Sequence, residues 1–420
     1  MRTPVVVRRL VPVVLVVVAL AKPLAAQETA VPASREEVQQ LREEVRSLKE
    51  ALAAMEARLA AMSLPPTAEA PEPALAQAPT PAPAADLAPL AASAIPAGSS
   101  KVFNPDIAVI GDFLGAAGRN PSPDAPPSLE LHEAEASFQA IVDPYARADF
   151  FLTFGPDEVG VEEGFITFPT VPGGLLLKVG KMRDAFGKVD SMHNHVLPWT
   201  DRPLVTQNLT GGEDGLADYG ASISRLIPNR VLFLEATAQV YRGESAVFAA
   251  QHRGDLAYVG HLRAYRDLGE STNLDLGGSF ASGGNDAGPG FRTRLWGADA
   301  TFRYRPLRRA IYRRLAARTE LVWSRRDQEP AAASAFGFYA STEYQFARRW
   351  YAGLRYDRSD RAEDPGLTDK GGSAFLSWWP SEFSQIRGQY RHIHFGEDKT
   401  ADEFLFQFLF SIGAHGAHAF

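Results

Sequence analysis

The chain has 420 residues, 45% of them hydrophobic, and its 43 basic and 50 acidic residues give a formal net charge of −7. This acidic balance argues against a nucleic-acid partner, because nucleic-acid binders normally carry a strongly basic domain. The absence of cysteine excludes a disulfide scaffold, a thiolate zinc site and a cysteine nucleophile.

Residues 1–26 have the form of a secretory signal peptide. Arg2, Arg8 and Arg9 precede an apolar run at residues 11–21, and Leu24-Ala25-Ala26 is an acceptable cleavage site. The run is too short to cross a bilayer as a helix, which excludes a helical transporter. A short membrane anchor is the weaker alternative to a signal peptide. We therefore expect the mature protein to leave the cytoplasm.

Residues 34–62 carry an unbroken heptad seam. Its apolar positions follow one another in steps of three and four: Val38, Leu41, Val45, Leu48, Leu52, Met55, Leu59 and Met62. Such a seam is buried only against another helix, so it predicts an oligomerising coiled coil, with a lone amphipathic helix as the alternative. The mixture of Val, Leu and Met does not distinguish two strands from three. Residues 63–100 are rich in proline and alanine and predict an extended linker.

From residue 101 to residue 420 the apolar pattern changes to a period of two. Ala136, Phe138 and Ala140 alternate with polar residues, and Phe404 begins a similar run in the last segment. Segments of about ten residues match strands that cross a membrane at a tilt, and short connections alternate with long ones. The expected strands are 105–114, 128–142, 145–155, 160–168, 174–182, 216–226, 231–242, 255–267, 273–282, 291–305, 314–326, 335–347, 350–358, 372–379, 384–395 and 402–412. The predicted fold is an all-β transmembrane barrel of about 16 antiparallel strands preceded by an α-helical coiled coil; a soluble sandwich or β-helix is the alternative.

The chain ends in Phe420 after an aromatic strand, which resembles the membrane insertion signal of bacterial outer-membrane porins. The order of signal peptide, coiled coil, linker and barrel is similar to that of trimeric porins with an N-terminal periplasmic coiled coil, including the phosphate-selective group. Gly180-Lys181-Met182-Arg183, leading into a long third loop, adds to this likeness. The resemblance implies an outer-membrane homotrimer, contact with outer-membrane lipid and the barrel assembly machinery, passive diffusion, and a third loop folded into the pore. The lumen face departs from phosphate-selective porins because its charges are mixed in sign.

The gap at residues 183–215 is the longest connection, and a loop of this length is usually functional. If it folds inward, its charged residues form the constriction: Asp190, His193, His195, Asp201 and Arg202. An external loop packed on a neighbouring protomer or on lipopolysaccharide is the alternative. His193 and His195 lie two apart, but no third ligand follows at a fixed spacing, so surface or hydrogen-bonded histidines are favoured. We expect no metal and no cofactor.

The inward face of the strands is predicted to carry the selectivity residues Arg147, Lys178, Arg263, Arg318, Arg355, Arg387 and Arg391. The last four come from late, neighbouring strands and form a hypothetical basic ladder for anions; ion pairs that rigidify the wall are the alternative. No Gly-x-Ser-x-Gly, Walker or His-Glu-x-x-His motif is present, and nothing singles out Ser279 or Ser341 with His261 as a catalytic pair. The favoured function is a porin for passive diffusion of small hydrophilic solutes, and the basic ladder would give it a preference for anions. The alternative is an anchor that tethers the envelope to peptidoglycan through the coiled coil.

Overall fold

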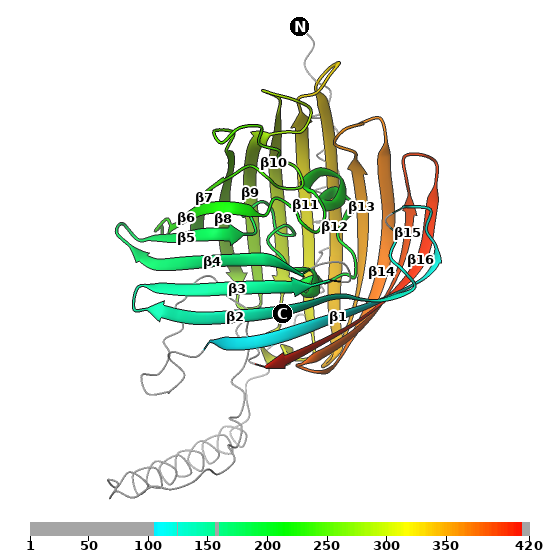
Figure 1. The fold of residues 1–420 in the computed structure, drawn as a ribbon. Coiled ribbons are helices and arrows are strands. Elements are labelled where there is room, and N and C mark those ends of the chain that lie inside the picture. The colour runs from blue at the N-terminus through cyan, green and yellow to red at the C-terminus, as the bar shows by residue number, and fades with distance from the viewer. Residues whose placement is uncertain (1–104, 124, 156–158, 414–420) are drawn as a thin grey trace, which may run out of the picture. The chain divides into compact units, whose positions relative to one another are not determined.

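The computed structural model describes residues 105–123, 125–155 and 159–413 (Figure 1). The signal peptide, the heptad seam, the linker and Phe420 lie outside these residues. Within them, sixteen antiparallel strands form one sheet in which each strand pairs with its neighbours in sequence and β1 closes the ring by pairing with β16. The predicted barrel is confirmed, and each expected strand overlaps an observed one. The strands are β1 Asp106–Arg119, β2 Leu129–Asp143, β3 Ala146–Phe154, β4 Val159–Val171, β5 Leu175–Met182, β6 Asp218–Leu226, β7 Phe233–Tyr241, β8 Ala257–Gly269, β9 Thr272–Gly284, β10 Arg292–Tyr304, β11 Arg314–Arg326, β12 Ala333–Ala347, β13 Trp350–Asp360, β14 Thr368–Ser381, β15 Ser384–His394 and β16 Thr400–Gly413.

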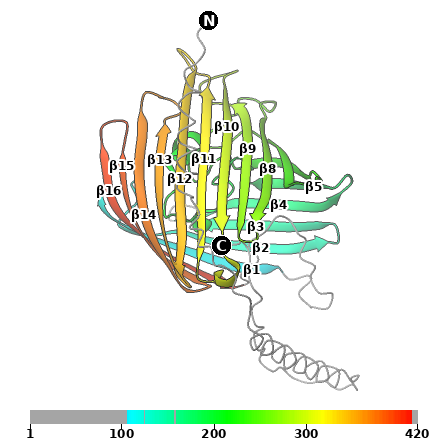
Figure 2. The same cartoon turned by 180° about the vertical axis from the view of Figure 1, so that it is seen from behind.

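The strands tilt strongly around the barrel. In Figure 1, β1 to β4 on the near wall cross in front of β9 to β14 on the far wall, and Figure 2 shows the far wall from behind. Closing a sheet into a barrel requires this tilt, so strands on opposite walls cross one another. One wall therefore carries the early strands, and the opposite wall carries the later ones.

Burial alternates along each strand in the way that the sequence pattern predicts. On β16, Phe404 and Phe406 are exposed, whereas Glu403, Leu405 and Gln407 are buried. Because successive side chains of a strand point to opposite faces, the exposed apolar set is the outer wall and the polar set is the lumen. Large outward side chains include Leu131, Phe150, Ile166, Val179, Ile223, Leu262, Leu276, Leu354, Leu376 and Tyr390.

Aromatic residues gather on the outer wall at the end of the barrel that carries the short turns. Trp350 opens β13 and Trp378 lies near the end of β14, with their rings stacked 5.7 Å apart. Tyr304 and Tyr344 are exposed near the ends of β10 and β12, which meet the same rim. Amphipathic rings at one rim of an apolar wall are typical of a membrane interface. In the part of the chain that the structure describes, no helix has the length and apolar character needed to cross a bilayer.

Most connections at one rim of the barrel are shorter than those at the other. Turns such as residues 144–145 and 348–349 are short, whereas residues 120–128, 242–256 and 361–367 form longer loops. An antiparallel barrel places successive connections at alternate ends, so the longer loops share one rim. The longest connection, residues 183–217 between β5 and β6, is called the inner loop below because its side chains reach several walls of the lumen.

Candidate functional site

The inner loop crosses the interior of the barrel. It contains two short helical turns, η2 (Asn194–Val196) and η3 (Thr206–Thr210). Figure 1 shows the green coil of η3 in front of β11, β12 and β13, and η3 contacts β11 and β13. The loop hydrogen-bonds to β2 and β4 through His193 and to β13, β14 and β15 through residues 200–208. It therefore lies inside the barrel, and the external alternative is wrong.

One end of the inner loop is held by acidic residues of β2 and β4. His193 Nδ1 lies 2.8 Å from Glu135 Oε2, and its Nε2 lies 2.8 Å from Glu163 Oε2. Arg183 pairs with Glu162, and its backbone N–H donates to Glu163 at 2.7 Å. We call this cluster the acidic anchor. It joins two cations of the loop to carboxylates of the wall.

A β-bulge in β4 makes this cluster possible. The pairing of β3 with β4 places Phe151 opposite Glu163 and Leu152 opposite Val161, so Glu162 is the extra residue. Regular alternation sends neighbouring side chains to opposite faces, whereas a bulge allows two in succession to reach the same side. Glu162 and Glu163 consequently both contact the loop from within the lumen.

Burial decides the electrostatics of the acidic anchor. The side chains of His193 and Glu135 are 2% and 1% exposed. Burial alone would lower the pKa of His193, but its hydrogen bonds to Glu135, Glu162 and Glu163 outweigh burial and raise this pKa well above 6.5. His193 is therefore a cation here unless another cation replaces its proton.

The middle of the inner loop carries the opposite charge. Asp201 Oδ1 accepts from Arg355 Nη2 at 3.0 Å, and Oδ2 accepts from Arg391 Nη1 at 2.9 Å. Gln389 of β15 also donates to Asp201. Burial alone would raise the pKa of Asp201, but the two arginines outweigh it and hold this pKa below 3.8. We call this cluster the basic anchor.

Between Arg183 and His193 the loop rests on β9 and β11. The N–H groups of Lys188 and Val189 donate to Glu320 Oε2 at 3.2 and 3.3 Å, and Lys188 Nζ reaches Asp275 at 2.7 Å. Gly187 has φ of 62°, and a Cβ there would stand 1.9 Å from Glu320 Oε1, so this tight passage requires glycine. Ser279 accepts the Gly187 N–H at 2.9 Å and lies 2.8 Å from His261 Nδ1, which makes it a support for the loop.

Apolar packing completes the loop's attachment. Trp199 is 1% exposed and lies edge-on to Tyr339 of β12, with ring centroids 5.1 Å apart. The Arg355 guanidinium lies over the Trp199 ring, 5.0 Å from its centroid. Phe186, Val205, Leu209 and Leu216 are also buried. A polar lumen wall offers few apolar partners. The loop therefore contributes many of the side chains of the small hydrophobic core that it forms with the wall.

Two of the predicted constriction residues stabilise the loop itself. Arg202 donates to the carbonyls of Val189 and Met192 and to Asn194 Oδ1, at 3.0, 2.6 and 3.0 Å. Asp190 accepts from Thr210 Oγ1 at 2.9 Å. Both side chains are almost fully buried, so they shape the loop and do not line open water. His193 and His195 were expected to be surface or hydrogen-bonded residues; they are 2% and 3% exposed, and His193 is hydrogen-bonded.

The predicted basic ladder is largely paired with acids. Besides Asp201, Arg355 binds Asp357 at 2.7 Å and Arg391 binds Glu403 at 2.8 Å. The other pairs are Arg318–Glu343 at 3.6 Å, Arg263–Asp275 at 2.8 Å and Arg147–Asp149 at 2.8 Å. Arg387 donates to the uncharged Ser377, Gln407 and Gln385, and Lys178 lies over the Phe165 ring. Much of the charge of these arginines is therefore compensated by neighbouring acids.

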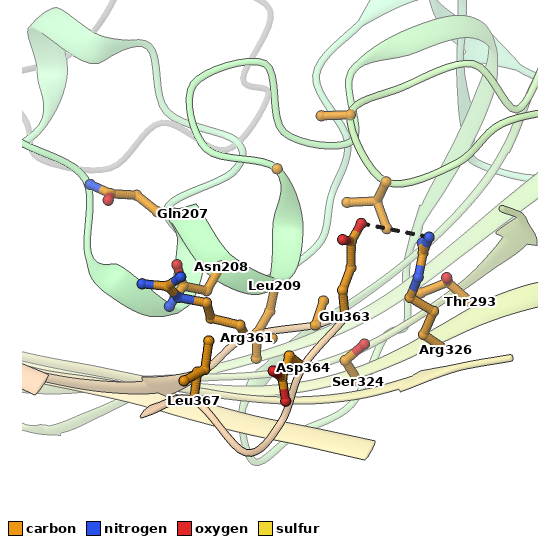
Figure 3. A pocket seen from close by; sticks show the side chains of 14 residues that line it. Gln207, Asn208, Leu209, Thr293, Ser324, Arg326, Arg361, Glu363, Asp364 and Leu367 are labelled. Atoms are coloured by element: carbon orange, nitrogen blue, oxygen red, sulfur yellow. Dashed lines mark ion pairs between the residues drawn. The ribbon is translucent and has the colours of Figure 1, made fainter. Parts of the chain in front are cut away.

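A cavity of about 390 Å³ lies beside η3 (Figure 3). Its lining brings Gln207 and Asn208 of the inner loop together with Arg326, Arg361 and Glu363 from the longer-loop rim. Arg326 pairs with Glu363, and Arg361 pairs with Asp369. The cavity therefore forms a charged hollow where the inner loop approaches that rim.

Known proteins resemble this chain to different degrees. No family model matches the sequence. An Aquifex aeolicus protein, described only as uncharacterized, is 32% identical over 391 residues, which span 77% of this chain and 81% of that protein. The chain belongs to the same family as this protein. Among solved structures, outer-membrane-expressed OmpT of Vibrio cholerae has a TM-score of 0.51 at 10% identity, over 73% of this chain and 97% of OmpT. OprB of Pseudomonas putida also has a TM-score of 0.51 at 10% identity, over 74% and 94% of the two chains. At such low identity these two structures show a shared barrel fold.

Sequence reasoning missed several residues that hold the inner loop. In the sequence, Arg183 is an ordinary loop residue and Glu162 an ordinary strand residue. Their pairing could not be predicted because it depends on the bulge in β4. Glu320 and Tyr339 are ordinary members of alternating strands until the loop reaches them. The only signal in the sequence was the unusual length of the loop, which indicated an inward segment but not its contacts.

Proposed function

We propose that the protein is an outer-membrane channel for passive diffusion of small hydrophilic solutes. The observation that carries the proposal is a closed barrel with an apolar outer wall and a polar lumen crossed by an anchored loop. Such a wall suits lipid outside and water inside, since every strand pairs with a neighbour on each side and the ring has no open edge. Its likeness in fold to OmpT and OprB supports the same location.

The inner loop is the proposed constriction. It places Asp201 and His193 against different parts of the barrel wall, each against charges of the opposite sign. A solute passing the loop therefore experiences a transverse field between acidic β2 and β4 and basic β13 and β15, which favours small polar solutes. We propose only weak anion preference, because Arg355 and Arg391 are neutralised by neighbouring acids.

Orientation and assembly follow from the N-terminal segments. A periplasmic coiled coil at residues 34–62 would place the short turns on the periplasmic side and the longer loops outside. The same coiled coil is proposed to join three barrels in a homotrimer, with outer-membrane lipid and the barrel assembly machinery as partners. Light scattering of the purified protein with and without residues 34–62 tests the assembly; a monomeric full-length protein would contradict it.

Channel recordings test the function directly. Purified protein, shown to be folded by its heat-modifiable electrophoretic mobility, is added to planar lipid bilayers under a salt gradient. We expect discrete conductance steps, together with swelling of proteoliposomes in small sugars. Folded protein that inserts into the bilayer and stays electrically silent, with no swelling, would overturn the proposal.

A further inference from the structure

A buried group of histidine and glutamate side chains lies where the inner loop meets β2 and β4. Glu135, Glu162 and His193 each direct one ligand-type atom into a space where all three atoms are within 4.8 Å of one another. A second set, Glu133, Glu135 and His195, meets the same criterion and shares Glu135. The sequence around the two histidines shows no third ligand, because the carboxylates come from strands that are distant in sequence.

The His193 ring faces three carboxylate oxygens but has at most two N–H groups to donate. Nδ1 faces Glu135 Oε2 at 2.8 Å and Glu162 Oε2 at 3.0 Å, while Nε2 faces Glu163 Oε2 at 2.8 Å. One N–H makes one well-directed hydrogen bond. Among the described residues, Glu162 Oε2 is buried without a hydrogen bond, although it stands beside this nitrogen. A cation at Nδ1 would satisfy both carboxylate oxygens at once.

The second ring nitrogen has the partner that metal-bound histidines usually have. A histidine that ligates a metal commonly donates its other N–H to a carboxylate, which fixes the tautomer and the ring orientation. Glu163 takes this place on Nε2, leaving Nδ1 for the ion. The ring of Phe151, with its centroid 5.2 Å from that of His193, packs beside it. The ring is thus held in one orientation.

Charge and burial point the same way. The side chains of His193, Glu135, Glu162 and Glu163 are only 2%, 1%, 12% and 11% exposed. With Glu133 on β2 also facing this space, the carboxylates outnumber Arg183 and His193, and buried carboxylates are costly without compensating cations. Imidazole and carboxylate donors without sulfur suit divalent first-row metals, zinc among them.

We propose that Glu135, Glu162 and His193 Nδ1 bind one divalent transition-metal ion, with Glu163 orienting the ring. The ion takes the place of the Nδ1 proton and ties the inner loop to β2 and β4. This inference does not depend on the barrel being a channel, since metal binding is measured without any conductance.

Zinc binding to the full-length protein in detergent is the test. Chelator-treated protein is dialysed against Zn²⁺, and bound metal is counted by mass spectrometry. We expect one Zn²⁺ per chain that is absent from Glu135→Gln, which removes the ligand common to both sets. Affinity should fall at least about tenfold in His193→Gln, the usual scale for losing a metal-site partner. His195→Gln should bind nearly as the unaltered protein does.

Matched controls use histidines elsewhere. His392 stands 2.6 Å from Asp402 near the longer-loop rim and faces the exposed side of β15, so His392→Gln should keep the ion. The double variant His415→Gln/His418→Gln removes the histidines near the chain end and should also keep it. Equal Zn²⁺ in the unaltered protein and Glu135→Gln would overturn the proposal, as would loss in His195→Gln but not in His193→Gln.

A spectroscopic measurement covers the case in which a variant fails to fold. X-ray absorption of the zinc-loaded unaltered protein should show a single imidazole among oxygen ligands, with a zinc–nitrogen distance of about 2.0–2.1 Å. A spectrum without imidazole scattering, or with two imidazoles, would contradict this ligand set.

Discussion

The acidic anchor and the basic anchor hold the inner loop by the same physics with the signs reversed. At the acidic anchor, Arg183 and His193 of the loop enter a group of wall carboxylates. At the basic anchor, Asp201 enters a pair of wall arginines. All of these side chains are largely buried, where an unpaired charge is costly. The loop therefore fits across the lumen in one direction only, because reversing it would bring like charges together.

The anchors differ in redundancy. The acidic anchor has two loop cations for several carboxylates, so the loss of one cation leaves the other in place. The basic anchor has a single loop carboxylate shared by Arg355 and Arg391. Substitutions at the basic anchor should consequently destabilise the folded protein more than substitutions at the acidic anchor.

Asp201→Ala should be the most destabilising change. It leaves Arg355 and Arg391 buried with only their wall partners Asp357 and Glu403, and breaking a buried ion pair costs about 3 kcal/mol or more. Unfolding in detergent, followed by heat-modifiable mobility, measures the loss. Asp143→Ala, which removes an exposed acid at the end of β2, is the control. Equal stability of Asp201→Ala and this control would show that the basic anchor does not hold the loop.

Arg183→Met should cost less, about 2 kcal/mol, a scale set by hydrogen bonds to charged groups. The change removes the pairing with Glu162 and the donation to the Glu213 carbonyl at 3.1 Å, whereas His193 still occupies the same carboxylates. The same unfolding assay applies. A loss larger than that of Asp201→Ala would contradict the proposed redundancy.

The contribution of Asp201 should depend on pH in a defined direction. Its pKa is below 3.8 in the folded protein, so its stabilisation is complete above the unfolded value of 3.8 and disappears as pH falls through the folded pKa. The stability difference between the unaltered protein and Asp201→Ala should stay constant from pH 7 to about pH 5 and shrink only in stronger acid. A difference that vanishes already at pH 5 would be inconsistent with the arginine pairing.

Ion selectivity should show the smallest effect. Arg387→Ser/Arg391→Ser removes two lumen cations, so the anion-to-cation permeability ratio should fall, as read from the reversal potential under a KCl gradient. The shift should be small because Arg391 is already paired with Asp201 and Glu403. Arg349→Ser, at a short turn, should leave the ratio unchanged. An unaltered reversal potential in the double variant would exclude the ladder.

Strand positions could be predicted closely, and their ends less so. The pattern suggested that β1 ends at residue 114 and that β14 begins at residue 372, yet β1 continues to Arg119 and β14 begins at Thr368. Gly115 and Gly371 lie in these extensions, and glycine adds no side chain to an alternating pattern. Pairing with β16 and with β13 extends the strands there.

The barrel wall could be predicted from the residue pattern, because the backbone pleat assigns neighbouring residues to opposite faces wherever a strand forms. The inner loop could be recognised by its length. Its contacts could not be predicted, because they depend on how the chain folds: Asp201 meets Arg391, 190 positions away, and His193 meets Glu135, 58 positions away. Contacts between such distant residues leave no local period, and the bulge at Glu162 breaks the one period that the wall has.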